Sequence, residues 1–321
     1  MADAAFIEEI KYRNDIEEVI SSYVQLHRAG SNYNALCPFH SEKTPSFTVF
    51  PSQISFYCFG CGAGGDVITF IMRAENLDFY SAVEFLAKRA GLEVPQSPGQ
   101  REESVRRTRL YEMNRVAAHF FHEQLKKSQP ALKYLMEKRR LQQSVINHFG
   151  LGFAPDGFGQ LTDYMHGQGF TDEELTIGFL CGKSQKNGRV YDYFRNRIMF
   201  PIIDVSGNVI AFGGRVMDDS KPKYLNSSDT PAFKKSRNLF ALNYAKKDCA
   251  EQLVLCEGYM DVIAMHAAGF TNAVATLGTA ITPEQARLMK RHTNRVVISY
   301  DNDSAGQRAA ERAFQLLSDA G

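Results

Sequence analysis

The chain has 321 residues and a mass of 36.1 kDa, which is enough for two or three domains of typical size. Its composition is 44% hydrophobic and 23% charged, its mean hydropathy is -0.30, and no apolar run reaches the ~18 residues of a membrane span. With 37 Lys and Arg against 36 Asp and Glu, only a local basic patch could indicate a nucleic-acid partner. Residues 1–5 lack the segments of a signal peptide, and six cysteines are too few for a disulfide scaffold, so we expect a cytoplasmic protein with no membrane partner.

Periodic segments before residue 94 predict a small β-centred module flanked by helices. Helices are expected at 6–13, 14–22, 66–74 and 79–90, and extended segments at 25–35, 46–50 and 54–57. Asn14 is the predicted N-cap of the second helix, with Glu17 at its N3 position. Prolines and glycine near residues 95–99 predict a linker. The predicted domains are 1–94, 104–252 and 253–321, with a linker at 95–103.

Beyond the linker the sequence pattern changes twice. Helical spacing starts at Ser104 and continues to about residue 148, and antiparallel strands are expected at 198–203 and 209–212. From residue 253 onward, three short apolar strands alternate with three helices, which is typical of right-handed parallel βαβ units. Thr282, Pro283 and Gln285 form a capping box that predicts the start of the middle helix.

Two short pairs of cysteine and histidine predict a metal site. Cys37 and His40 are three positions apart, as are Cys58 and Cys61, and this spacing can present both members of a pair to one ion. A Cys3His set is a usual ligand set for tetrahedral structural zinc, so we expect one Zn2+ per chain. Basic and aromatic residues nearby could bind a single strand or pack a small core, and both readings remain open for Lys43, Phe47, Phe56, Tyr57 and Phe59.

Carboxylates follow two of the predicted parallel strands. Glu257 comes directly after residues 253–256, and Asp301 and Asp303 come after residues 296–300. Ligands bind at the carboxyl ends of the strands in such sheets, so these acids are expected to converge with Asp261. Clustered carboxylates favour Mg2+ or Mn2+ and phosphate substrates. Stabilisation of a helix N-terminus would explain Asp303 alone but not Glu257 and Asp301.

A basic stretch lies between the two sites. Residues 189–237 contain nine Lys or Arg against five Asp, and they are interleaved with aromatic residues at Tyr191, Tyr193, Phe194, Tyr224 and Phe233. This pattern favours a surface that follows a phosphate backbone. A solvated charged face is the alternative.

These motifs together resemble those of bacterial DnaG-type primases. The Cys/His cluster is similar to the zinc-binding domain of that family, and residues 257–261 and 300–306 resemble its TOPRIM motifs. Residues 212–215, 222–227 and 277–280 resemble three further family motifs. The resemblance implies an α+β protein with an N-terminal zinc-ribbon domain and a mixed α/β primase core, ending in a partial parallel TOPRIM βαβ sheet.

The implied activity is synthesis of short RNA primers on single-stranded DNA for replication, as a DNA-directed RNA polymerase. The implied partners are the DNA template, ribonucleoside triphosphates and the replicative helicase, with Mg2+ or Mn2+ as the catalytic cofactor. The family continues past the last motif with another acidic motif, a helical subdomain and a helicase-binding domain, so this chain is expected to be an N-terminal fragment that makes primers poorly.

The resemblance also assigns site residues. Glu257, Asp301 and Asp303 would be catalytic and hold magnesium, with Asp261 as a weaker candidate, and the Cys/His set would hold zinc. The nucleic-acid or nucleotide contacts would be Arg195, Arg215, Lys223, Tyr224, Asn226 and Lys235, with Lys43 in the first domain.

Two other functions fit parts of the sequence. One is a TOPRIM nuclease or topoisomerase-like phosphotransfer enzyme, although a topoisomerase needs a tyrosine nucleophile on a further domain and a nuclease needs no zinc knuckle. The other is a zinc-dependent module that binds single-stranded DNA without activity. Ribonucleotide incorporation, strand cutting or binding alone would distinguish the three.

Overall fold

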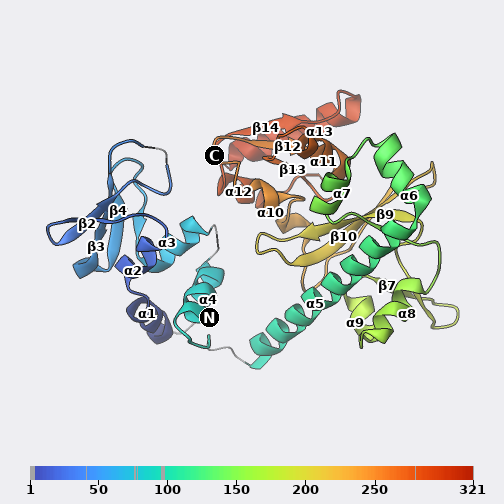
Figure 1. The fold of residues 1–321 in the computed structure, drawn as a ribbon, viewed down its shortest axis with the longest axis horizontal. Coiled ribbons are helices and arrows are strands. Elements are labelled where there is room, and N and C mark those ends of the chain that lie inside the picture. Colours follow the sequence, from blue (N-terminus) through green and yellow to red (C-terminus); the bar gives the residue numbers. More distant parts are fainter. Residues whose placement is uncertain are drawn as a thin grey trace. The chain divides into compact units, whose positions relative to one another are not determined.

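The computed structural model describes residues 4–40, 42–75, 77, 79–94, 98–278 and 280–320 (Figure 1). The chain forms two compact units, Met1–Arg101 and Glu102–Gly321. The boundary between the units lies inside the predicted linker, whose residues 95–97 are outside the described ranges. None of the helices in these ranges is both long and apolar enough to cross a bilayer.

The first unit is built on an antiparallel sheet of five short strands in chain order, β1-β2-β3-β4-β5. The strands are β1 (His27–Ala29), β2 (Asn32–Ala35), β3 (Phe47–Phe50), β4 (Ser55–Cys58) and β5 (Gly64–Gly65), with a 3-10 turn, η1 (Pro51–Gln53), between β3 and β4. The helices are α1 (Ala4–Arg13), α2 (Ile16–Ser21), α3 (Val67–Ala74) and α4 (Phe79–Arg89). The predicted helices and extended segments of this unit are therefore confirmed.

Four phenylalanines lie at the centre of the core of the first unit. Phe47, Phe56 and Phe70 are almost fully buried, and their rings pack on one another and on Phe39. Each such side chain removes a large apolar area from water, which stabilises a small sheet that could not hold together by itself.

The predicted N-cap of α2 is wrong by one position. Asp15, not Asn14, caps the helix, and its Oδ1 accepts the Glu18 N–H at 3.0 Å. Asn14 is fully buried, and its Nδ2 donates to the carbonyl oxygens of Ile10 and Leu86. Asn14 thereby ties α1 to the end of α4, a contact across 72 positions that the local sequence could not indicate.

The second unit begins with a long helix, α5 (Pro98–Lys127). It starts before the predicted Ser104, because proline is well tolerated in the first turn of a helix and so does not end the periodic segment. The helical stretch then continues through α6 (Gln129–Lys133), one π-helical turn, η2 (Tyr134–Lys138), and α7 (Gln143–His148). Ser128 caps α6. The predicted helical stretch to about residue 148 is confirmed.

An antiparallel sheet in the order β11-β10-β9-β6 packs against α5. Its strands are β6 (Gly152–Ala154), β9 (Arg197–Ile203), β10 (Val209–Val216) and β11 (Tyr224–Asn226). A smaller hairpin and short helices stand between them in sequence: α8 (Gln160–Gly167), α9 (Asp172–Ile177), β7 (Cys181–Lys183) and β8 (Val190–Asp192). The predicted pairing of residues 198–203 with 209–212 is confirmed.

The last part of the chain is a parallel sheet in the order β13-β12-β14. It follows η3 (Lys235–Arg237) and α10 (Leu242–Ala245), and comprises β12 (Leu253–Cys256), α11 (Tyr259–Ala267), β13 (Ala273–Ala275), α12 (Pro283–Lys290), β14 (Val296–Ser299) and α13 (Ser304–Asp319). The capping box of Thr282 and Gln285 at α12 is confirmed.

The two larger sheets of the second unit share one core. The ring of Phe200 in β9 stacks on that of Tyr259 in α11 at 5.0 Å, and Phe240 bridges to Ala275 in β13. The hydrophobic core therefore crosses residue 252, and residues 102–321 form one compact unit. The further division of this unit at 252 stays a prediction.

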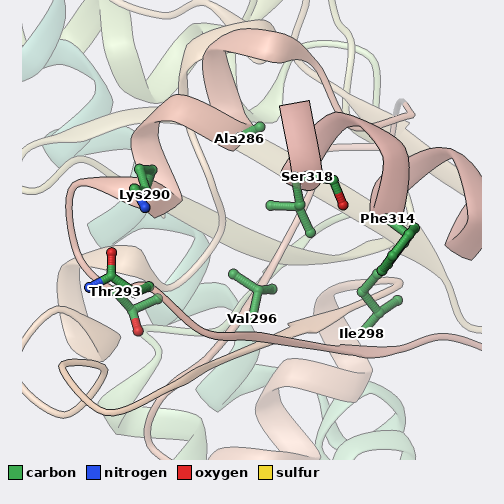
Figure 2. Close-up of a pocket in the computed structure, with 9 residues that line it drawn as sticks. Ala286, Lys290, Thr293, Val296, Ile298, Phe314 and Ser318 are labelled. Atoms are coloured by element: carbon green, nitrogen blue, oxygen red, sulfur yellow. The ribbon is translucent and has the colours of Figure 1, made fainter. Parts of the chain in front are cut away.

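A hollow of about 250 Å³ lies beside β14, between α12 and α13 (Figure 2). Val296 and Ile298 of β14 face it together with Phe314 of α13, whose side chain is 66% exposed. Among the described strands, β14 pairs with β12 alone, so its other edge is open.

Candidate metal centre and catalytic site

The four predicted metal ligands meet in the first unit. Cys37, His40, Cys58 and Cys61 each offer one ligand atom, and these atoms all lie within 4.8 Å of one another. The sulfurs of Cys37 and Cys61 are 3.8 Å apart, as are Cys58 Sγ and His40 Nδ1. Zinc bonds of ~2.0–2.3 Å in a tetrahedron require separations close to these. The donor set and its geometry therefore fit a structural zinc ion.

Two glycines shape the loop around the ligands, for different reasons. Gly62 has a φ of +74°, which favours glycine, and its N–H donates to the Cys58 carbonyl at 2.9 Å. Gly60 has no positive φ, so backbone conformation does not explain the glycine there. A Cβ at Gly60 would lie 2.8 Å from His40 Nε2, so the close approach of the histidine ring requires glycine there.

The thiols of the cluster differ in their ionisation. Burial raises the pKa of the Cys37 thiol. Burial also opposes ionisation of Cys58, but its contact with Ser46 Oγ and hydrogen bonds from the N–H groups of Cys61 and Gly60 outweigh it and lower the pKa of Cys58. Metal ligation requires the thiolate form, so Cys58 is the thiol whose ionised form the surrounding protein stabilises.

The sequence left two roles open for the aromatic residues around the cluster, core packing and strand binding, and the structure divides the residues between them. Phe47 and Phe56 are core residues. Tyr57 and Phe59 are 42% and 70% exposed, and their rings meet edge to face at 5.0 Å. Lys43 is exposed and lines a separate hollow of about 380 Å³ with His27 and Leu36. The surface that could bind a strand is therefore smaller than the sequence suggested.

The predicted acidic edge lies at the carboxyl ends of β12 and β14. These strands are neighbours in parallel register, with Cys256 opposite Ser299, so Glu257 and Asp301 follow adjacent strand ends. Glu257 Oε2 accepts the Asp301 N–H at 3.2 Å. The topology thus brings these two acids together as expected.

Asp303 and Asp261 are held by helix caps. Asp303 is the N-cap of α13, and its Oδ1 accepts the N–H groups of Ala305 and Gly306. Asp261 Oδ2 accepts the Gly258 N–H at the start of α11. The capping role suggested as an alternative for Asp303 is therefore present, and its Oδ2 makes no contact to these amides.

The acids do not form a closed ligand cluster. In the part of the chain that the structure describes, the Cys37 set is the one group of three or more metal-ligating side chains whose ligand atoms come within bonding reach of a common point. Glu257, Asp301 and Asp303 are exposed and lie less close together.

A basic cavity of about 270 Å³ opens on the second unit, which also carries the acidic edge. Its lining includes Tyr134, Lys138, Arg139, Arg215, Lys221 and Lys223. Arg215 is 9% exposed, and its Nε donates to Tyr134 Oη at 2.8 Å while an Nη donates to Tyr224 Oη. Arg215 is therefore fixed in place by the two tyrosine hydroxyls.

Sequence reasoning missed three residues of this cavity, Tyr134, Lys138 and Arg139. They come from the π-helical turn η2 and its C-cap, far from the basic stretch in sequence. Lys138 and Arg139 both lie over the Tyr134 ring, at 5.5 and 5.2 Å from its centroid. The run Lys138-Arg139-Arg140 was the available signal, but a charged run in a helix is usually a solvated face.

The other predicted contact residues have different environments. Arg195 lies 4.3 Å over the exposed ring of Phe158 and donates to the Asp192 carbonyl. Asn226 donates to the Leu277 carbonyl and accepts the Tyr259 hydroxyl, so its amide is used within the protein. Lys223 is exposed and Lys235 is half-buried.

Part of the basic stretch points inward. Arg197 is 8% exposed and donates to the Pro222 carbonyl at 3.0 Å, while Phe194 and Phe233 are core residues. Residues 197–202 of β9 are all buried, and Phe194 and Phe233 lie in connecting segments that pack inward, which a count of charges along the sequence ignores. Thr279, in one of the family-like motifs, lies outside the described residues.

Three family descriptions match successive parts of the chain. The CHC2 zinc finger matches residues 2–102, the N-terminal domain of the DNA primase catalytic core matches residues 120–246, and the Toprim-like family matches residues 254–321.

Known proteins match across these boundaries. A DNA primase of Clostridium acetobutylicum is 46% identical over 318 residues, which cover 98% of this chain and 53% of the relative. The crystal structure of the Aquifex aeolicus primase, with its zinc-binding and RNA polymerase domains, is matched with a TM-score of 0.63 at 38% identity, covering 98% of this chain and 77% of that one. A DnaG primase catalytic domain bound to single-stranded DNA has a TM-score of 0.61 at 40% identity, with 66% and 69% covered.

The chain spans about half the length of the curated relatives that it matches. It nevertheless covers most of the two-domain Aquifex aeolicus structure. The zinc-finger, catalytic-core and Toprim-like matches follow one another along the chain without overlap. The chain therefore belongs to the DnaG-type family of bacterial DNA primases.

Proposed function

We propose that this chain carries the zinc-binding and nucleotidyl-transfer parts of a primase that makes short RNA primers on single-stranded DNA during replication. The acidic edge supplies the cation site, and the basic cavity supplies contacts to phosphates. The single observation that carries the proposal is that the two regions lie on one unit and are linked by packed rings. Tyr224, which accepts from Arg215, packs on Tyr259 at the start of α11, the helix that follows Glu257. The ssDNA complex of a related catalytic domain supports a single-stranded template.

Charges of both the acidic edge and the basic cavity affect the pKa of Asp261. It is exposed by area, yet neighbouring protein atoms still desolvate its carboxyl and raise its pKa; the negative charge of Asp301 raises it further, and the positive charge of Arg215 opposes the shift. Asp301 belongs to the acidic edge and Arg215 to the basic cavity. A nucleoside triphosphate needs such an arrangement, with cation ligands and fixed positive charges on opposite sides of its phosphates.

Each group has a role in this chemistry. A primer 3′-hydroxyl attacks the α-phosphorus of the incoming nucleotide. The new P–O bond forms as the bond from that phosphorus to the α,β-bridging oxygen breaks, pyrophosphate leaves with the electron pair, and the hydroxyl proton is released to solvent. Glu257, Asp301 and Asp303 would hold Mg2+ or Mn2+, which when bound would stabilise the charge that develops on the phosphate oxygens. Arg215 would hold phosphate by charge-assisted hydrogen bonds, with Lys223, Lys138 and Arg139 around it and Tyr224 as its support.

The zinc cluster has a structural role in the proposal. Four protein ligands leave no open position for substrate. Lys43, Tyr57 and Phe59 would contact the template in the first unit, and Arg195, Asn226 and Lys235 would contact template or nucleotide in the second. Ribonucleoside triphosphates and the replicative helicase remain expected partners.

The test is incorporation of labelled ribonucleotides on single-stranded DNA with Mg2+ or Mn2+. We expect weak synthesis by residues 1–321, and robust synthesis when the chain is completed with the remaining part of the Clostridium acetobutylicum relative. Glu257→Gln should abolish synthesis without changing the melting temperature, because it removes a cation ligand from an exposed edge. Glu251→Gln, at an exposed position just before β12, is the matched control and should keep full activity.

The other outcomes separate the alternatives. Cutting of the DNA strand without polymerisation would indicate the nuclease reading, and binding without either reaction would indicate a single-strand-binding module. Full activity of the Glu257→Gln protein would show that the acidic edge is not the catalytic site.

A further inference from the structure

One carboxylate outside the ligand set touches three parts of the zinc cluster. Glu42 Oε1 accepts the N–H groups of Cys37 at 2.7 Å and Ser46 at 3.1 Å. Its Oε2 accepts the Ser46 hydroxyl at 2.5 Å and lies 3.2 Å from His40 Nε2. The Glu42 side chain is only 11% exposed. A largely buried carboxylate that accepts three hydrogen bonds is held in one position, and it holds its donors in turn.

The histidine ring has a defined orientation between the cluster and this carboxylate. His40 Nδ1 faces the cluster, 3.8 Å from Cys58 Sγ, and Nε2 faces Glu42 on the other side of the ring. A neutral imidazole carries one proton, and the nitrogen that binds a metal must be the one without it. A carboxylate at Nε2 therefore favours the tautomer that leaves Nδ1 free.

We propose that Glu42 is a positioning residue for the metal centre, which fixes the orientation and the Nε2–H tautomer of His40 so that Nδ1 binds the ion. The proposal rests on the metal site described above. Carboxylates that accept from a ligand histidine commonly orient it and increase its basicity, and their loss typically weakens metal binding about 10–100-fold.

Ser46 extends the arrangement to a second ligand. Its Oγ lies between Glu42 Oε2 and Cys58 Sγ, at 2.5 Å from the first and 3.2 Å from the second. The space on its other side is closed, because a Cβ at Gly60 would approach Ser46 Oγ to 2.7 Å. Glu42 thus acts on His40 directly and on Cys58 through Ser46.

A purely structural role for Glu42 makes a different prediction. In that case the carboxylate would matter only because it ties Cys37 N–H and Ser46 N–H together. Glu42→Gln tests the difference, because the amide oxygen can still accept both N–H groups while its NH2 group cannot accept from His40 Nε2–H. Loss of the loop bonds and loss of the histidine acceptor are therefore separable.

The experiment compares zinc release and histidine tautomer in the complete 321-residue chain. Zinc-loaded wild type, Glu42→Gln, Ser46→Ala and Glu84→Gln are treated with a chromogenic chelator, and long-range 1H–15N spectra report the two ring nitrogens of His40. Glu84 is an exposed residue of α4 in the same unit and serves as the control.

We expect Glu42→Gln to release zinc at least 10-fold faster, with altered His40 15N shifts, Ser46→Ala to release it faster by a smaller factor, and Glu84→Gln to match wild type. Unchanged release and unchanged shifts in Glu42→Gln would overturn the proposal. If Glu42→Gln does not fold, unchanged release from Ser46→Ala, or a wild-type His40 bound through Nε2, would overturn it instead. A wild type that holds no zinc would refute the metal site itself.

Discussion

The zinc cluster and the acidic edge are both sets of metal-ligating side chains, but they are prepared differently. The four ligands of the cluster lie within 25 positions of sequence, on loops of one small sheet, and their atoms already converge. The acids of the edge come from two strand ends 44 positions apart, and they are exposed.

Hydrogen bonding explains why the ligand atoms of the zinc cluster converge and the acids of the edge do not. At the cluster, backbone N–H groups and Ser46 organise the ligands around a common point. At the edge, backbone N–H groups occupy one oxygen each of Asp303 and Asp261, which holds the acids apart at separate helix starts. A cluster prepared in this way suits a permanent ion, whereas the edge suits a cation that arrives with a substrate.

The largest expected effect is loss of the zinc ligand Cys61. Cys61→Ser should release zinc and unfold residues 4–94 while residues 102–320 stay folded, because structural zinc contributes on the order of 10 kcal/mol to small domains. Metal analysis and two-step thermal unfolding measure this. Cys249→Ala in the second unit is the control and should keep zinc. Full zinc retention by Cys61→Ser would contradict the ligand assignment.

A smaller effect is expected at Arg215, which is fixed in the cavity rather than in a metal site. Arg215→Ala removes the donor of the Tyr224 hydroxyl, whereas Tyr134 Oη keeps its two bonds from Arg139, and the change should lower the free energy of unfolding by about 1–3 kcal/mol. It should also weaken nucleotide binding, measured by titration with a fluorescent ribonucleotide. Arg237→Ala, at an exposed position, should change neither. Unchanged nucleotide affinity in Arg215→Ala would exclude the cavity as the phosphate site.

The two roles of Asp303 can be separated by a matched pair of substitutions. Asp303→Ala removes the N-cap of α13 and should cost about 1 kcal/mol, as should Asp15→Ala at α2. Asp303→Asn should retain most of that stability, since asparagine also caps helices, but should lose Mn2+ affinity. Chemical denaturation and Mn2+ titration give the two readouts. Equal Mn2+ affinity in Asp303→Asn and wild type would leave Asp303 with the capping role alone.

The smallest expected effects are at Lys223 and Lys235. Alanine at either position should leave folding nearly unchanged and reduce the dependence of single-stranded DNA binding on salt by about one counterion. Binding measured at several salt concentrations gives the slope. A slope identical to wild type would identify the two lysines as parts of a solvated face.

Local signals predicted most of the elements and the metal cluster. The ligands were predictable because both pairs have short spacings, and α12 because Thr282 and Gln285 cap it within four residues. Asn14 was misread because its partner, Leu86, is distant in sequence. Phe194 and Phe233 were misread because burial depends on which face of a strand or loop packs inward.

The cavity and Glu42 could not have been derived from the sequence for a related reason. Tyr134 meets Arg215 across 81 positions, and only the packing of η2 on the sheet brings them together. Glu42 is close to its partners in sequence, but an acid next to a lysine carries no sign that it will be buried between a histidine and two backbone amides.

The open edge of β14 has a consequence for handling the protein. An unpaired strand edge with exposed Val297 and the neighbouring apolar hollow is a template for strand addition from another chain. Arg295, at an exposed position, flanks it with positive charge, which opposes such pairing while that charge remains unscreened. Concentrated preparations of residues 1–321 should therefore be more prone to aggregation in high salt, and low ionic strength should keep them dispersed.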